Sequence, residues 1–158
     1  MARKHFDTLL SRVGDAIGVG NLEADADGYC LLRVDGQLEL SIEFDEDSQS
    51  VILSAACGQL SATASSQILL ELLSANFYWS GAGGSTLSVH GPTRTVYLQY
   101  RETIDHLDAP RLQDLLHAML MNSETWSERL TALASGQAAP GAAVPMPVDP
   151  PPWGGIRV

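Results

Sequence analysis

The acidic stretch Glu23-Ala24-Asp25-Ala26-Asp27-Gly28 has the alternating carboxylates with which a calcium-binding loop begins. Such a loop carries a bidentate Glu at its twelfth position, and counting from Glu23 that position is Val34. The residues after Gly28 also alternate as a strand does, whereas a calcium loop leads into a helix. The stretch therefore predicts an acidic turn rather than a metal site.

Other residue types capable of chemistry do not combine into a site. The glycine-rich segment 80–85 is followed by a strand pattern and lacks the Lys of a phosphate-binding loop, and no G-x-S-x-G is present. Glu43, Asp45 and Asp47 surround a turn, where carboxylates are solvated instead of desolvated for acid–base work. No two histidines stand at a metal-ligand spacing; they are His5, His90, His106 and His117. The sequence predicts a protein that is not an enzyme and has no metal or cofactor.

The two cysteines, Cys30 and Cys57, both fall in strand patterns. Buried reduced thiols are the favoured interpretation, and a strand-to-strand disulfide stays open. No window approaches the roughly 18 apolar residues of a membrane-spanning helix. The first residues lack the apolar core of a signal peptide because Asp7, Ser11 and Arg12 interrupt it. These features predict a cytoplasmic protein.

The composition describes a small acidic globular protein. At 158 residues and 16.9 kDa the chain is most simply one domain. Its net charge of −10 and pI near 4.6 argue against nucleic acid as a partner, because nucleic-acid binding depends on basic patches. Strong acidity favours solubility and fits a cationic or weakly soluble partner without identifying one.

The chain is organised around a β-hairpin predicted between Asp25 and Phe44, with Asp35-Gly36 in its turn. A three-residue loop, 34–36, pairs Arg33 with Gln37, and we expect this register because a shorter loop would place a charge in the core. It puts on the core face Cys30, Leu32, Leu38 and Leu40. The opposite face is too apolar for a plain solvated surface; it carries Tyr29, Leu31, Arg33 and Glu39.

Apolar spacing predicts the remaining elements. The first helix has Phe6 as the first residue of its apolar spacing and ends at Gly18 or Gly20. Strand 51–57 is apolar on both faces, which favours a central position in the sheet. A second helix begins near Ser65 or Ser66 with a hydroxyl cap, and a flexible glycine loop at 81–84 leads to strands near 87–89 and 96–100. Asp108 caps the last helix. The order α-β-β-β-α-β-β-α predicts an α+β fold with a twisted antiparallel sheet packed by helices.

The composition changes from Ser135 onward, where six of the eight prolines lie. Such a segment buries too little to offset the entropy of ordering it. We therefore expect a folded domain over 1–134 and a disordered Pro/Gly/Ala-rich tail over 135–158.

Aromatic residues gather at the end of the second helix, in Phe77-Tyr78-Trp79. Aromatic side chains with one polar end favour protein interfaces, so Tyr78 and Trp79 predict one here. Trp126, in the apolar stripe of the last helix, is interpreted as core.

The order of elements resembles the class I type III secretion chaperones, the Tir-chaperone (CesT/SycE-like) family. The resemblance covers about residues 5–133. The similar segments are FDTLLSRVGDAIGV, Asp27-Gly28-x-Cys30, VDG, LELSIEF, ILLELLSANFYW and ETWSERL.

The resemblance implies a homodimeric, non-enzymatic chaperone in the bacterial cytoplasm that binds the N-terminal chaperone-binding region of a secreted effector. It implies a dimer interface of Leu69, Leu72, Leu73, Phe77, Trp79, Leu87 and Val89. It implies effector contacts at Phe6, Leu10, Tyr29, Leu31, Arg33 and Leu38. A secretion ATPase as a further partner of the tail stays open.

Two other functions stay open. The same fold is compatible with a regulator that sequesters another small protein to control secretion genes, and only the identity of the partner separates the two. A small-molecule enzyme working through the acidic turns is the third hypothesis.

Overall fold

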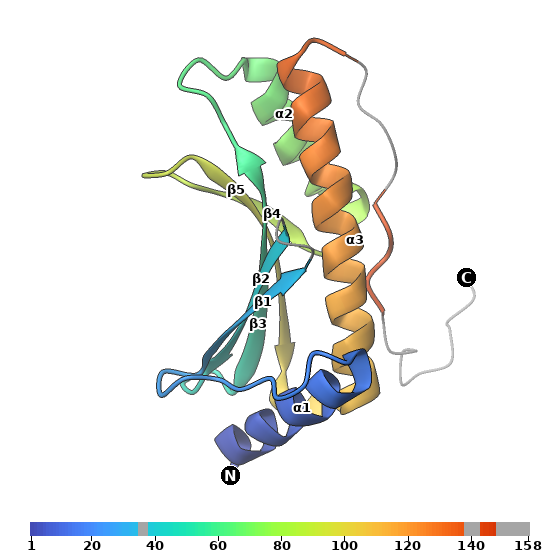
Figure 1. The fold of residues 1–158 in the computed structure, drawn as a ribbon. Coiled ribbons are helices and arrows are strands. Elements are labelled where there is room, and N and C mark those ends of the chain that lie inside the picture. The colour runs from blue at the N-terminus through green and yellow to red at the C-terminus, as the bar shows by residue number, and fades with distance from the viewer. Residues whose placement is uncertain (35–37, 138–142, 148–158) are drawn as a thin grey trace, which may run out of the picture.

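The structure, a computed structural model, describes residues 1–34, 38–137 and 143–147. Figure 1 shows its elements, which follow the predicted order. They are α1 (Ala2–Ile17), β1 (Tyr29–Val34), β2 (Leu38–Asp45), β3 (Ser50–Gln59), α2 (Ser66–Ala75), the 3-10 helix η1 (Phe77–Ala82), β4 (Thr86–His90), β5 (Thr95–Thr103), the 3-10 turn η2 (Ile104–His106) and α3 (Ala109–Ala134).

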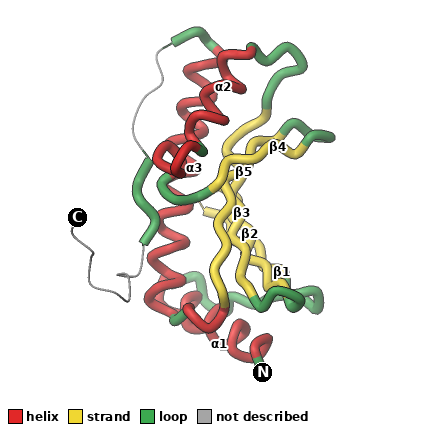
Figure 2. The backbone as a smooth tube through the Cα atoms, turned by 180° about the vertical axis from the view of Figure 1, so that it is seen from behind, coloured by secondary structure: helices red, strands yellow, loops and turns green. Residues whose placement is uncertain are grey.

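The strands form one antiparallel sheet of order β1-β2-β3-β5-β4, so β3 is central as its two-sided apolar pattern predicted. Helix α3 lies along one face of the sheet, with α1 near one end and α2 near the other (Figure 1). Seen from behind, no described helix covers the opposite face of the sheet (Figure 2). The predicted α+β class is confirmed, and the architecture leaves one sheet face free for other contacts.

The hairpin faces agree with the prediction, but the register differs by two residues. Arg33 pairs with Glu39 instead of Gln37, and Val34 pairs with Leu38. The turn residues 35–37 lie outside the described residues. Because side chains alternate with period two, a shift of two residues moves no side chain to the other face. Cys30 and Leu32 are therefore buried as expected, whereas Tyr29 and Leu31 are exposed.

The core lies between the sheet and α3. Trp126 is fully buried, as its place in the apolar stripe predicted, and its indole Nε1 donates to the Gly81 carbonyl at 3.1 Å. Phe6 of α1 stacks on Phe44 of β2 with ring centroids 5.4 Å apart. These contacts join both ends of the molecule to α3 and the sheet.

Helix ends follow local chemistry at two of three predicted positions. Gly18, at φ 74°, ends α1 in the left-handed conformation that glycine adopts readily. The Asp108 carboxylate accepts the Arg111 backbone N–H at 2.8 Å and caps α3, with Pro110 in its first turn. Ser65 precedes α2, but its hydroxyl makes no capping hydrogen bond, so that part of the prediction was wrong.

The tail departs from the expectation of disorder within residues 143–147. Met146 is only 3% exposed, and Asn122 of α3 hydrogen-bonds the backbone of Val144. The physical reason is a buried amide and an apolar recess on the domain, which composition alone does not reveal. This segment extends the folded part beyond residue 134.

A half-buried ion pair joins β5 to α3, and it should make stability depend on pH. Glu102 accepts from Arg111 Nη2 at 2.6 Å and from the Tyr100 hydroxyl at 3.0 Å. Burial by itself would raise the pKa of the Glu102 carboxyl, but these hydrogen bonds and the Arg111 charge lower it on balance. Because the folded-state pKa is the lower one, the stabilisation exists above the unfolded pKa and is lost as pH falls through the folded one.

We expect Glu102→Gln to lower the free energy of unfolding by about 1–3 kcal/mol at neutral pH. The difference from wild type should shrink as the pH falls below the ordinary Glu pKa of about 4.3, because the unfolded carboxyl then takes up a proton that the folded one binds only at its own lower pKa. Urea unfolding followed by circular dichroism, at neutral pH and again in acid, measures this difference. Glu46→Gln, at an exposed turn, is the control, and a Glu102→Gln deficit independent of pH would contradict the ion-pair explanation.

Candidate functional site

Helix α2 presents leucines on two sides. Ile68 and Leu72 face the core, at 7% and 5% exposure, whereas Leu73 is 69% exposed. The large apolar residues that α2 and η1 expose all lie within residues 69–79, and we call them the α2 patch: Leu69, Leu70, Leu73, Phe77, Tyr78 and Trp79. A large apolar patch of this kind on a small protein is typical of a protein-binding surface.

The aromatic end of the patch has a strained backbone. Tyr78 and Trp79 have φ of 51° and 53°, a left-handed conformation that bulky residues rarely adopt. The segment 77–84, which we call the aromatic loop, is held at its base by Asn76, whose side-chain amide accepts from the Leu87 N–H at 2.8 Å and donates to the Leu87 carbonyl at 3.0 Å. Strain persists only where the surroundings determine it, and such sites are often functional.

The glycines of this loop are packed, which corrects the prediction of a flexible loop at 81–84. A Cβ on Gly81 would stand 2.7 Å from Ala75 Cα, so only glycine allows this close approach. The Gly81 carbonyl accepts from Trp126, and Ala82 is fully buried. The aromatic side chains are therefore displayed from a fixed backbone.

The predicted dimer residues divide between the protein surface and the core. Five are exposed: Leu69, Leu73, Phe77, Trp79 and Val89. Leu72 and Leu87 are buried at 5% and 6% exposure, so their assignment to an interface was wrong. Both face the core because they lie on the inner side of α2 and of β4. Leu70, at 58% exposure, belongs to the α2 patch although the prediction did not name it, and the unbroken pair Leu69-Leu70 was the available signal.

The uncovered sheet face is a second candidate surface. Tyr29 and Leu31 are 40% and 39% exposed on β1, which is an edge strand. A polar row crosses the neighbouring strands, with Gln99 donating to Ser54 Oγ at 3.1 Å and accepting from Ser88 Oγ at 2.7 Å. An edge strand has unpaired N–H and C=O groups that can add an extended peptide as a further strand.

The predicted effector residues do not share one surface. Tyr29 and Leu31 lie together on the uncovered face, and Arg33 beside them pairs with Glu39 at 2.8 Å. Leu38 is half-buried on the opposite, helix-facing side. Phe6 and Leu10 are fully buried, so their assignment as effector contacts was wrong.

Phe6 and Leu10 form the inner side of α1, where they pack into the core instead of facing a partner.

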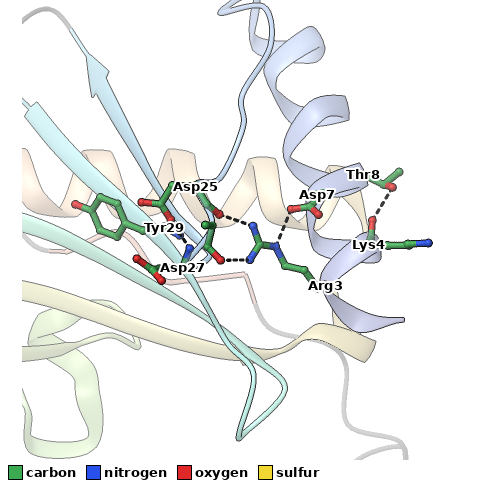
Figure 3. A network of polar contacts seen from close by, with 8 residues as sticks. Arg3, Lys4, Asp7, Thr8, Asp25, Asp27 and Tyr29 are labelled. Carbon is green, nitrogen blue, oxygen red and sulfur yellow. Dashed lines mark hydrogen bonds and ion pairs between the residues drawn. The ribbon is translucent and has the colours of Figure 1, made fainter.

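The acidic turn is built around Arg3 of α1 (Figure 3). Arg3 Nη2 donates to the Asp25 carbonyl at 2.5 Å, and its Nε pairs with Asp7 at 3.0 Å. The Asp25 carboxylate accepts the backbone N–H groups of Asp27 and Tyr29 at 3.0 and 2.9 Å. Asp25 therefore closes the turn and starts β1, which is the predicted structural role. Within the described residues, no three His, Cys, Asp or Glu side chains group as a metal site would require.

Both cysteines are buried and unpaired. Burial raises the pKa of the Cys57 thiol to about 12 from an ordinary 9.0, and burial together with the Asp25 charge raises that of Cys30. At pH 8 this lowers the reactive thiolate fraction of Cys57 by roughly a thousandfold.

We expect Cys57 to resist iodoacetamide in the folded protein and to react readily in urea. Mass spectrometry of the digested protein after timed alkylation at pH 8 measures this site by site. The unfolded chain is the control for intrinsic reactivity. Rapid modification of Cys57 under native conditions would contradict the buried, protonated state.

None of the described helices combines the length and the apolar character that crossing a bilayer demands. Six of the large apolar side chains exposed on the described residues make up the α2 patch, and two more, Tyr29 and Leu31, lie on the uncovered sheet face.

The fold of this small α+β domain is similar to that of chains in two solved complexes. A chain of the ExsC–ExsE complex superimposes with a TM-score of 0.68 at 21% identity, over 77% of this chain and 90% of that one. A chain of the HopA1–SchA chaperone–effector complex gives 0.67 at 19% identity, over 81% and 97%. The chain belongs to the Tir chaperone protein (CesT) family, whose model matches residues 8–127.

The sequence relatives agree with this membership. The Tir chaperone of Escherichia coli O157:H7 is 22% identical over 118 residues, which cover 75% of this chain and 74% of that protein. The predicted family is thereby confirmed.

Proposed function

We propose that the protein is a cytoplasmic, homodimeric type III secretion chaperone that binds the N-terminal region of an effector and has no catalytic activity. The observation that carries the proposal is the separation of two exposed surfaces on one small domain: the apolar α2 patch, and the uncovered sheet face with Tyr29 and Leu31 at its edge. The α2 patch lies at the end of the molecule far from α1, and the uncovered sheet face lies opposite the helices (Figures 1 and 2).

The α2 patch is the proposed dimer interface. Its exposed aromatic side chains are residue types that are enriched in protein interfaces. Burying them between two copies would remove the apolar surface that a single acidic domain leaves in water. The dimer would then present two uncovered sheet faces to one partner.

The uncovered face is the proposed effector surface. Ordering an unfolded peptide costs several kcal/mol, so a wide surface is needed to offset that cost. Tyr29 and Leu31 supply apolar contacts beside an edge strand whose backbone can pair with the peptide. The chain's net charge of −10 keeps such a surface soluble until the partner arrives.

Co-expression with the N-terminal regions of effectors from the same bacterium tests the proposal. We expect a stable complex whose effector segment is protected from protease yet lacks a folded core of its own by hydrogen exchange. Failure with every effector would refute it. Capture of a small regulatory protein in place of effectors would favour the hypothesis that the protein is a regulator of secretion genes. Cell fractionation tests the proposed cytoplasmic location. Addition of the organism's secretion ATPase to the complex tests that further partner.

A further inference from the structure

A buried amide on α3 recognises the backbone of an extended segment far along the chain. Asn122 is fully buried within the apolar side of its helix. Its Nδ2 donates to the Val144 carbonyl at 2.8 Å, and its Oδ1 accepts the Val144 N–H at 2.6 Å. An amide that hydrogen-bonds both the N–H and the carbonyl of one residue recognises its backbone and makes no use of its side chain. The Val144 side chain is accordingly exposed, at 41%.

Met146 fills a recess beside two glycines of the aromatic loop. Its side chain is buried at 3% exposure, and its N–H donates to the Gly83 carbonyl at 2.5 Å. A Cβ on Gly83 would stand 2.7 Å from Asn122 Nδ2, and a Cβ on Gly84 would stand 3.2 Å from Met146 Cβ. The absence of both Cβ atoms makes the room in which the segment lies.

The same glycines belong to the loop that displays Tyr78 and Trp79. The Gly84 N–H donates to the Trp79 carbonyl at 3.0 Å. This N–H belongs to the same peptide group as the Gly83 carbonyl, which accepts from Met146. Tyr78, Trp79 and Met146 also line one shallow hollow. A segment seated here therefore supports the loop in addition to the Asn76–Leu87 hydrogen bonds.

We propose that Asn122, Gly83 and Gly84 form a binding slot for an extended peptide, that the chain's own segment 143–147 occupies it, and that this occupancy holds the aromatic loop in its strained conformation. The slot takes an extended backbone followed by a buried methionine. Asn122, Gly83 and Gly84 lie within the family match, which ends at residue 127, whereas the segment that occupies the slot lies beyond it. The aromatic loop is part of the proposed dimer interface, so an effect of slot occupancy on dimerisation rests on the proposed function. The slot itself does not rest on it.

Amide hydrogen exchange of the full-length protein by NMR tests the occupancy. We expect the Val144 and Met146 amides to be protected in the wild type, because both donate hydrogen bonds. Met146→Asp should lower the protection of Val144 and of Gly84 by about tenfold or more. Val144→Ser is the matched control and should leave both unchanged, because only the backbone of Val144 is bound. Unprotected Val144 in the wild type, or unchanged Gly84 protection in Met146→Asp, overturns the proposal.

A peptide added in trans tests the slot separately. A synthetic peptide of residues 143–147, Ala-Val-Pro-Met-Pro, should restore Gly84 protection in full-length Met146→Asp, and the same peptide with Asp in place of Met should not. Absence of restoration at millimolar peptide overturns the slot as a peptide-binding site. If the wild type is a monomer, the proposed dimer fails while these exchange measurements still decide the slot.

Discussion

Trp79→Asp should convert a dimer of this protein into folded monomers. The substitution places a carboxylate at the aromatic end of the α2 patch, where dimerisation would bury it without a partner. An unpaired buried charge costs about 3–5 kcal/mol, which raises the dissociation constant by more than about a hundredfold. The fold should survive because Trp79 is 55% exposed and stands at φ 53°, a conformation that Asp tolerates better than Trp. Light scattering gives the mass, and circular dichroism gives the folded state.

Val19→Asp is the matched control for this substitution. Val19 is 57% exposed in the loop after α1, far from α2, so the same charge on a similarly exposed apolar residue should leave the dimer intact. A wild-type monomer, or a Trp79→Asp protein that keeps its dimeric mass, would remove the α2 patch as the dimer interface.

The alternation of apolar residues predicted the hairpin faces but left its register undetermined. Any shift by an even number of residues keeps Cys30 and Leu32 in the core, so the pattern alone accepts both the predicted pairing of Arg33 with Gln37 and the observed pairing with Glu39. The turn geometry decides between them, and turn geometry depends on the local backbone. Faces were therefore predictable from the sequence, and partners across the strands were not.

The second helix shows a different limit. Leucines occupy both sides of α2, so helical spacing could not tell which side faces the core. Leu72 packs inward at 5% exposure and Leu73 faces outward at 69%, a division set by where β4 and α3 lie. The same reasoning explains Phe6 and Leu10, whose apolar side of α1 was correctly recognised but was assigned to a partner instead of the core.

The aromatic loop depends on contacts between distant segments, which no local pattern displays. Asn76 bonds Leu87, Trp126 bonds Gly81 and Met146 bonds Gly83. A run of glycines in sequence suggests flexibility, but here the missing Cβ atoms allow packing. One signal was available: Asn122 interrupts the apolar stripe of α3, and a buried amide requires partners.

Leu31→Asp should abolish effector binding and leave the dimer intact, the converse of Trp79→Asp. Leu31 is 39% exposed on the edge strand of the uncovered face, and its neighbour across the sheet is Ser41. A charge there would stand beside the apolar side chains of an added peptide strand and lose part of its hydration, so we expect the effector dissociation constant to rise by about a hundredfold or more. Its side chain contributes nothing to the core, so the melting temperature should change little. Isothermal titration calorimetry with the effector's N-terminal region measures the affinity.

The conservative control is Leu31→Val, which keeps an apolar residue suited to a strand and should bind within severalfold of wild type. Leu31→Asp with undiminished affinity would move the effector away from the uncovered face, and loss of affinity together with loss of the dimer would show that the two surfaces are not independent. The pair Trp79→Asp and Leu31→Asp thus separates self-association from partner binding, because each changes one apolar surface while the other keeps its contacts.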